Sequence, residues 1–467
     1  MIERATSAAW WRDRAIEAWS KRELRWLALV LLIATAVRIA WVLYAARAPQ
    51  ELHDPFFYML YAGRIASGDG YTTLDGLPTA YYPIGYPATL GGVFALLKHT
   101  FLPENYVMAA ASFNVVLGVA TVGLAYAVAQ RLFDTTVGLV TALILALFPN
   151  LVYQTAAPLT ETLFNFTVMA SLLMFFSIDW RQRSFETWRL AGFGVLLGYS
   201  GLVRPISLPF LGILLIVLLA GGYGWRRALQ HTAIATIAAF AVILPWAVRN
   251  VIVMDAPVLI STNLGDDLCM GHYPGAPGHF TLPDLCFGGY DELKRPEFET
   301  RRDHDNRRRA LVYARDHPGA EVKLIAKKAR WTWDHDHDGL DAIESYGDDR
   351  FIDAGLRAFL VHVADGYFFV VMAIGGVGLF GLVLPWWEPR RIFFLLALLL
   401  LAFVPLAFFG DARFHVPSVP LISVAAAWAI VMGVRALPKQ AANAQARSGV
   451  VVELADAEAP VTDQDAL

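Results

Sequence analysis

Residues 26–46 read WLALVLLIATAVRIAWVLYAA, and this stretch decides the class of fold. Arg38 is its one charged residue, and about 20 mainly apolar residues suffice for a helix to cross the hydrocarbon of a bilayer. Similar blocks recur along the chain, separated by short loops rich in Arg, Pro and Gly. We predict membrane spans over 26–46, 106–130, 136–154, 161–179, 190–205, 206–222, 228–250, 360–384, 392–409 and 415–436.

The composition agrees with lipid as the solvent of this chain. Of the 467 residues, 57% are hydrophobic and only 17% are charged, whereas soluble domains are about half apolar and a quarter charged. This excludes a soluble enzyme. The net charge of -3 and the absence of a basic stripe give no support to a nucleic-acid partner.

Charge also predicts the topology. The segment 1–25 is basic and rich in Trp, with no A-x-A cleavage site, so we expect it to stay at the cytoplasmic face. If 84–101 lies on or dips into the outer face, the remaining basic clusters fall inside, as the positive-inside rule requires. These clusters are Arg131, Arg181–Arg183–Arg189, Arg226–Arg227, Arg390–Arg391 and Arg435–Lys439. The alternative, in which 84–101 spans and 190–222 is one helix, is disfavoured by Pro205 and Pro209.

We therefore expect an all-α polytopic membrane protein with about ten spans, juxtamembrane helices and two large extracytoplasmic segments. The predicted parts are an interfacial segment 1–25, a transmembrane module 26–250 with a first outer loop 48–105, a second outer loop 251–359, C-terminal spans 360–437 and a disordered cytoplasmic tail 438–467. The tail is polar, acidic late on and without aromatic residues.

The two cysteines of the chain, Cys269 and Cys286, both fall in the second outer loop. In an oxidising outer compartment such a pair is a candidate disulfide. The alternative is two unpaired small apolar side chains. The spacing of Cys and His matches no zinc motif.

Isolated charged residues meet one membrane face in this topology. They are Asp54 with its neighbour His53 after the first span, Glu161 at the start of the fourth, Arg204 and Arg249 at the ends of the fifth and seventh, and Asp411, Arg413 and His415 between the ninth and tenth. Charges near lipid are costly unless they are paired or hydrated, which makes them functional candidates. Arginine forks suit a phosphate on a lipid tail, and a carboxylate can accept a proton from a hydroxyl nucleophile.

Several short motifs carry a resemblance to a known family. In order they are His53-Asp54-Pro55, Tyr82-Pro83-x-Gly85-Tyr86-Pro87, Pro158-x-x-Glu161, Gly201-Leu202-x-Arg204-Pro205, Pro245-Trp246-x-x-Arg249-Asn250, Ser261-Thr262-Asn263, His317-Pro318 and Arg413-Phe414-x-x-Pro417. Together they resemble the GT-C glycosyltransferases. The similarity is greatest to the bacterial branch related to dolichyl-phosphate-mannose protein mannosyltransferases, lipid A aminoarabinose transferase and rhizobial lipopolysaccharide-core galacturonosyltransferases.

The resemblance implies an inverting transferase in the bacterial inner membrane, with its site on the extracytoplasmic side. Its partners would be a polyprenyl-phosphate sugar donor and a lipid, glycan or protein acceptor. Asp54 matches the position of the base, and Glu161 matches an acidic pocket position. The substrate-binding or structural candidates are Arg204, Arg249, Arg413, His53 and His415. One departure is that Tyr81-Tyr82-Pro83 replaces a Glu-Lys pair, so a lysine contact to the donor phosphate is missing there.

Other interpretations stay open. The run Asp334-His335-Asp336-His337-Asp338-Gly339 has the spacing of a calcium loop but lacks Glu at its twelfth position. A divalent ion is therefore possible there, although a solvated acidic turn is the simpler explanation, and we assign no metal ligand.

The alternatives for function are a transporter or flippase of a lipid-linked saccharide, a non-catalytic assembly subunit, or a hydrolase that uses Asp54 and Glu161.

Overall fold

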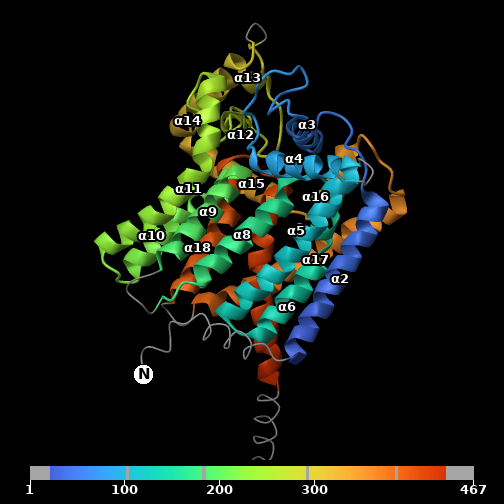
Figure 1. Ribbon diagram of the computed structural model, residues 1–467, viewed down its shortest axis with the longest axis vertical. Helices are drawn as coiled ribbons and strands as arrows, with labels where there is room; N and C mark the ends of the chain where they lie inside the picture. Colours follow the sequence, from blue (N-terminus) through green and yellow to red (C-terminus); the bar gives the residue numbers. More distant parts are fainter. Residues whose placement is uncertain (1–20, 101–104, 181–185, 291–293, 384–387, 438–467) are drawn as a thin grey trace, which may run out of the picture.

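The chain folds into a bundle of tilted helices with a smaller helical layer over one end (Figure 1). The computed structural model describes residues 21–100, 105–180, 186–290, 294–383 and 388–437. The described part is helical and contains no strand beyond isolated bridges. Most of the expected segment 1–25 and the expected tail 438–467 lie outside the described residues.

Six helices of the described part are long and apolar enough to cross a membrane. They are α2 (Lys21–Ala45), α5 (Tyr106–Leu132), α11 (Trp225–Met254), α17 (Ala354–Val383), α18 (Pro389–Phe403) with the turn that follows it, and the helix over 419–437 with the turns before it. The chain is therefore an integral membrane protein, as its apolar blocks predicted.

The predicted span 136–154 is bent rather than one straight helix. It consists of α6 (Thr135–Ala146) and the short α7 (Pro149–Tyr153), which meet at an angle of 62°. Phe148 is extended, as the residue before a proline prefers to be. Pro149 lacks the N–H that a continuing helix needs, and it starts the new helix instead.

Arg38 lies at this bend, although it belongs to the middle of α2. Its side chain is buried and donates to the carbonyls of Leu145 and Ala146, at 3.1 and 3.0 Å. These carbonyls end α6 and have no partner in the next helical turn. The charge that sequence arguments treat as costly in lipid is thus neutralised in part by the end of a helix dipole.

Three further helices of the bundle are shorter. They are α8 (Thr160–Phe176), α9 (Thr187–Val203) and α10 (Phe210–Ala220). The turn η3 (Pro205–Ser207) separates α9 from α10, so the predicted break at Pro205 is present and 190–222 is not one helix. Because the short and bent helices do not settle how many segments cross the bilayer, the count of about ten spans stays a prediction.

The two predicted outer loops lie together at one end of the bundle (Figure 1). The first contains α3 (Asp54–Ser67) and α4 (Gly85–Lys98); the second contains α12 (Leu264–Gly271), α13 (Asp284–Phe287), α14 (Glu297–Asp316), α15 (Pro318–Trp333) and α16 (Asp338–Ile343). Buried Glu299 joins them, since it accepts from the Thr79 hydroxyl and the Ala80 N–H of the first and the Thr262 hydroxyl of the second.

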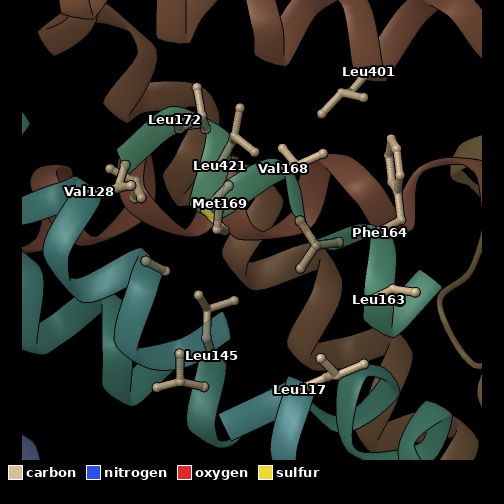
Figure 2. Packing of buried hydrophobic residues seen from close by; sticks show 14 of the residues in the cluster. Leu117, Val128, Leu145, Leu163, Phe164, Val168, Met169, Leu172, Leu401 and Leu421 are labelled. Atoms are coloured by element: carbon tan, nitrogen blue, oxygen red, sulfur yellow. The ribbon is translucent and has the colours of Figure 1, made fainter. Parts of the chain in front are cut away.

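A large cluster of aliphatic and aromatic side chains forms the bundle core, with buried polar side chains such as Asn114 and Thr141 among the same helices. Figure 2 shows Leu117 and Val128 of α5, Leu145 of α6, Phe164 and Met169 of α8, and residues of α18 and 419–437 in one cluster. The short helix α8 packs between α5 and α9 in this core, which sets the positions of its ends.

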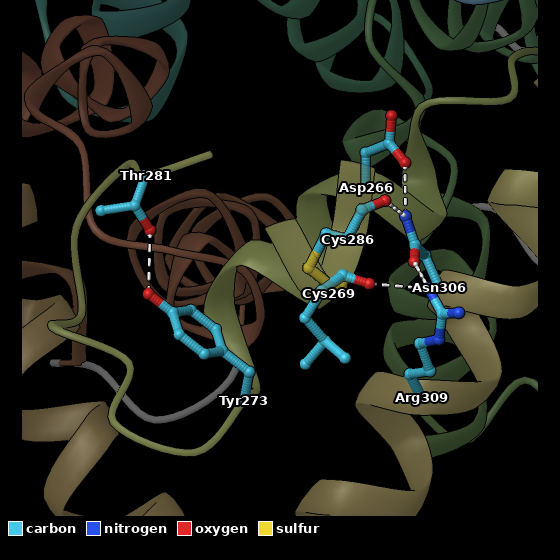
Figure 3. The surroundings of a disulfide bond; sticks show 8 residues. Asp266, Cys269, Tyr273, Thr281, Cys286, Asn306 and Arg309 are labelled. Atoms are coloured by element: carbon cyan, nitrogen blue, oxygen red, sulfur yellow. Dashed lines mark hydrogen bonds between the residues drawn. A yellow bond between two sulfur atoms is a disulfide. The ribbon is translucent and has the colours of Figure 1, made fainter. Parts of the chain in front are cut away.

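A disulfide joins Cys269 of α12 to Cys286 of α13, as the sequence suggested. Figure 3 shows Asn306 of α14 beside it, donating to the carbonyl of Cys286 and to Asp266. Asp266 is fully buried and also accepts from the Tyr81 hydroxyl of the first outer loop. The bridge thus belongs to the contact between the two loops.

Candidate active site

Arg413 is the centre of a cluster of charges formed by distant parts of the chain. It lies in η6 (Ala412–Phe414), a turn between two long helices. Its Nη1 donates to Asp54 Oδ2 at 2.8 Å, and its Nε donates to Glu161 Oε1 at 2.9 Å. The guanidinium therefore bridges a carboxylate of the first outer loop and one of the bundle.

Glu161 is the second residue of α8 and is fully buried. Arg204, which ends α9, donates from Nη2 to Glu161 Oε1 at 2.5 Å and from Nε to Thr160 Oγ1 at 2.8 Å. Two arginines thus share the Glu161 carboxylate, and together with Asp54 the group contains two guanidinium groups and two carboxylates. Such a pair of guanidinium groups is suited to an anion.

Asp54 is the first residue of α3 and is followed by Pro55, a favourable residue for the first turn of a helix. Both of its oxygens are engaged, since the Tyr82 hydroxyl donates to Oδ1 at 2.7 Å and Arg413 donates to Oδ2. Burial and the negative charge of Asp54 raise the pKa of Tyr82 well above its ordinary value. Tyr82 therefore keeps its proton and acts as a donor to Asp54.

Two further carboxylates face Arg413: Asp411, one of the charges that the sequence predicted at this membrane face, and Asp338, which was not predicted there. Asp338, at the start of α16, has Oδ2 at 3.9 Å from Arg413 Nε, and Asp411 Oδ1 accepts from the Arg413 N–H at 2.9 Å. Burial raises the pKa of both carboxyls, while the charge of Arg413 lowers it. The sequence placed Asp338 only in a possible metal run, and no spacing relates it to Arg413.

His53 lies at the edge of this cluster. Its Nε2 is 2.8 Å from Asp348 Oδ2, and its ring is 5.1 Å from the ring of Tyr346. Ser345 and Tyr346 both have positive φ, at 48° and 55°, a backbone conformation that costs about 1–3 kcal/mol per residue outside glycine. The second outer loop thus closes over the start of α3.

Arg249, another predicted site residue, lies elsewhere. It donates to the backbone carbonyls of Thr79 and Tyr71, at 2.8 and 3.0 Å, and stacks on Trp246. These contacts fasten the first outer loop to α11. The described residues show no contact between Arg249 and Asp54, Glu161 or Arg413, so the structure favours its structural interpretation.

His415 is buried behind the cluster. Its Nδ1 is 2.7 Å from the carbonyl oxygen of Thr332 and its Nε2 is 2.9 Å from Asp336 Oδ1. Asp336 also accepts from the side chain of Asn150 on α7, at 2.5 Å. Because both ring nitrogens have partners within the protein, His415 supports the turn that carries Arg413.

The acidic and histidine side chains of residues 334–339 point to different partners. Asp336 faces His415, His337 pairs with Asp365, and Asp338 faces Arg413. Within the described ranges no group of three or more His, Cys, Asp or Glu side chains is placed to hold a metal ion.

Comparisons with known proteins fit this architecture. Residues 92–248 match the family model for dolichyl-phosphate-mannose-protein mannosyltransferases. A comparison with curated proteins finds no match.

Among solved structures, ArnT from Cupriavidus metallidurans bound to undecaprenyl phosphate is similar, with a TM-score of 0.54 and 14% identity. The alignment covers 86% of this chain and 60% of that chain, so the chain spans about 60% of the length of ArnT. The Archaeoglobus fulgidus oligosaccharyltransferase complex with Zn and sulfate gives 15% identity, 90% and 51% coverage, and a TM-score of 0.49, which is too low to carry an argument.

The helical bundle with its layer of loop helices is that of a polytopic membrane protein with the GT-C fold. The GT-C fold that the sequence motifs indicated is thus confirmed, and the segment 92–248 matches the mannosyltransferase model.

Proposed function

We propose that the chain is an inverting glycosyltransferase that moves a sugar from a polyprenyl-phosphate donor to an acceptor of the bacterial cell envelope. The contact that carries this proposal is the bridge from Arg413 to Asp54 and Glu161. It brings the carboxylate of Asp54, the proposed base, close to the guanidinium groups of Arg413 and Arg204 at one end of the helix bundle. These are the groups that transfer from a lipid phosphate requires.

Arg204 and Arg413 are the proposed ligands of the donor phosphate. Their side chains are 17% and 12% exposed, so they are largely shielded from water yet reachable. Guanidinium groups bind phosphate oxygens in pairs and remain charged when partly buried. The undecaprenyl phosphate bound to ArnT is the kind of ligand that these two forks would suit.

Asp54 is not free to act as a base while Arg413 occupies Oδ2. We infer that an arriving phosphate draws Arg413 away from this oxygen, which then accepts the proton of the acceptor hydroxyl. The acceptor oxygen forms a bond to C1 of the sugar as the bond from C1 to the phosphate oxygen breaks. The electron pair of that bond goes to the phosphate, whose charge the arginines stabilise, and the proton stays on Asp54 until water removes it.

The proposed location of the site is the extracytoplasmic side of the inner membrane. Basic residues support this placement, because they gather at the opposite ends of the helices. Arg226 and Arg227 begin α11, Arg390 and Arg391 begin α18, and Arg435 lies near the end of 419–437, where it pairs with Asp134. A cytoplasmic excess of Arg and Lys is the usual sign of orientation.

The test is the substitution Asp54→Asn, which keeps the shape of the side chain and removes the base. We expect turnover to fall by about 10²–10⁴-fold, the usual contribution of a general base, while binding of undecaprenyl phosphate is kept. Envelope glycans of a deletion strain, complemented with either variant and analysed by mass spectrometry, give the readout.

The matched control is Asp75→Asn, which makes the same change at an exposed position of the first outer loop. It should leave the glycans unchanged. Near-normal transfer by the Asp54→Asn variant would exclude Asp54 as the base.

A further inference from the structure

The helix α15 has a surface that the proposed reaction does not use. Its inner face, with Leu324, Lys328 and Thr332, is buried, and it packs on η6 and on η5 (Val404–Ala407), the turns beside the ends of two long helices. Figure 1 shows α15 at the level of α4, between the bundle and the layer of α12 and α14. The helix thus lies at the end of the bundle that carries the two outer loops.

The outer face of α15 has an apolar stripe beside a basic stripe. Val322 and Ile325 are 69% and 46% exposed and lie three residues apart. Lys323, Lys327 and Arg330 are exposed as well and follow one another at spacings of four and three. Because residues three or four apart share one face of a helix, each set forms a continuous row.

The basic row is unpaired. None of Lys323, Lys327 and Arg330 has a carboxylate partner among the residues that the structure describes. On the neighbouring helix α14, Arg302 pairs with Asp266 and Arg307 pairs with Asp303, while the exposed Arg301 and Arg308 also have no carboxylate partner among the described residues. The positive charge of α15 is therefore available to an external anionic group.

We propose that α15 lies in the head-group layer of the bilayer beside the site, with Val322 and Ile325 in the acyl boundary and Lys323, Lys327 and Arg330 on the phosphates of anionic lipids. Helices with an apolar face next to a basic face bind at such interfaces. Each lysine or arginine near an anionic surface contributes about 1 kcal/mol, or about fivefold in binding. Long basic side chains reach the head groups while their stems stay in apolar contact.

Contact with lipid on this helix would bear on the site. The carbonyl oxygen of Thr332 is 2.7 Å from His415, two residues after Arg413. A helix held by the membrane surface would therefore keep the η6 turn in place. The lipid contact itself does not depend on glycosyl transfer, so a failure of one proposal is distinguishable from a failure of the other.

The experiment places a fluorescent label on Ala326→Cys, between the two rows. Since the two native cysteines form a disulfide, the new thiol is the one available for labelling. The full-length protein is reconstituted in nanodiscs of brominated phosphatidylcholine, with or without phosphatidylglycerol. A label on His304→Cys, at an exposed position of α14, serves as the reference for a position away from lipid.

We expect quenching at position 326 that increases with phosphatidylglycerol, and little quenching at position 304. Adding Lys323→Gln and Lys327→Gln should remove the increase, whereas Arg301→Gln with Arg308→Gln, two equal charge losses on the exposed side of α14, should not. The proposal is overturned if position 326 is quenched no more than position 304. It is equally overturned if quenching at position 326 changes neither with phosphatidylglycerol nor on substitution of the two lysines.

Discussion

Arg413 is the residue on which the proposed chemistry depends most, because one guanidinium contacts two carboxylates in different directions. A lysine has a single point of charge and cannot reproduce the fork. We expect Arg413→Lys to lower kcat by roughly 10²–10³-fold, the usual effect of removing one group that stabilises developing charge. Steady-state transfer in detergent or nanodiscs measures it.

Arg249→Lys is the control, since Arg249 contacts the first outer loop and not the charge cluster. It should lower thermal stability while the rate per folded molecule changes little. Equal losses of kcat in the two variants would contradict the central role of Arg413.

Lys328 offers a prediction about pH. Burial lowers its pKa from the ordinary value of 10.5 to about 8, with Nζ at 3.1 Å from His272 Nε2. Between these two values the unfolded chain binds the proton more tightly than the folded protein does, so stability rises with pH across this window and is lost as pH falls toward 8. Lys328→Met should lack this dependence.

Thermal unfolding of both proteins between pH 8 and 10.5 measures the difference. The contribution of the tyrosines, which titrate at high pH in both proteins, cancels when the stability of the variant is subtracted from that of the wild type. Parallel curves for the two proteins would show that Lys328 is not shifted by burial.

At the scale of elements, the contact between α9 and α11 positions Arg204. Gly194 and Gly198 of α9 lie against the backbone of Ala235 and Ala239, and an added Cβ would come within 2.1 and 2.3 Å of their carbonyl oxygens. Close approach through small residues is a usual way for membrane helices to associate. The position of the C-terminal end of α9, which carries Arg204, thus depends on glycine at positions 194 and 198, because a larger side chain would clash with α11.

We expect Gly194→Ala with Gly198→Ala to cost about 1–3 kcal/mol per clash and to displace Arg204 from Glu161. The melting temperature and the transfer rate should both fall. Gly212→Ala on α10, where a Cβ meets no atom within 4 Å, is the control and should leave both unchanged. Unaltered melting of the double variant would mean that α9 and α11 can separate at no cost.

At the scale of the whole molecule, a ligand that contacts Arg204 and Arg413 ties together segments that are far apart in sequence. Undecaprenyl phosphate without a sugar should therefore raise the melting temperature, by an amount that grows with the logarithm of its concentration. Binding at 100 times the dissociation constant corresponds to about 2.7 kcal/mol. Differential scanning fluorimetry in detergent micelles measures the shift.

Arg204→Gln combined with Arg413→Gln should abolish this increase, while the Asp54→Asn variant keeps it. A shift of the same size in the arginine variant would show that the phosphate binds elsewhere.

Much of this molecule could be predicted from its sequence. The length of the apolar segments predicted most of the long helices. The expectation that isolated charges meet at one membrane face correctly predicted that Asp54, Glu161, Arg204 and Arg413 lie together. The reason is that lipid restricts where charge can lie, so topology and chemistry are coupled. The GT-C fold followed from motifs that are individually short.

Other features could not be predicted from the sequence. The bend after Ala146 arises from Pro149, but a proline alone does not say whether a helix kinks or ends. Arg249 satisfies backbone carbonyls of a loop whose path only the tertiary fold defines. Tyr82 and Asp338 reach the cluster from loops, where no periodicity indicates which side chain points inward.

The contact between Arg38 and the end of α6 links two unusual features of a membrane bundle: a buried charge in α2 and the bend between α6 and α7. In hydrocarbon a free carbonyl and a lone cation are each unfavourable, and here each removes the penalty of the other. Straightening the helix would leave the guanidinium with only the Ala34 carbonyl of its own helix as acceptor, and replacing Arg38 by leucine would remove the donor that meets the carbonyls of Leu145 and Ala146. Neither change is tolerable alone, so related chains should keep both features or have lost both together.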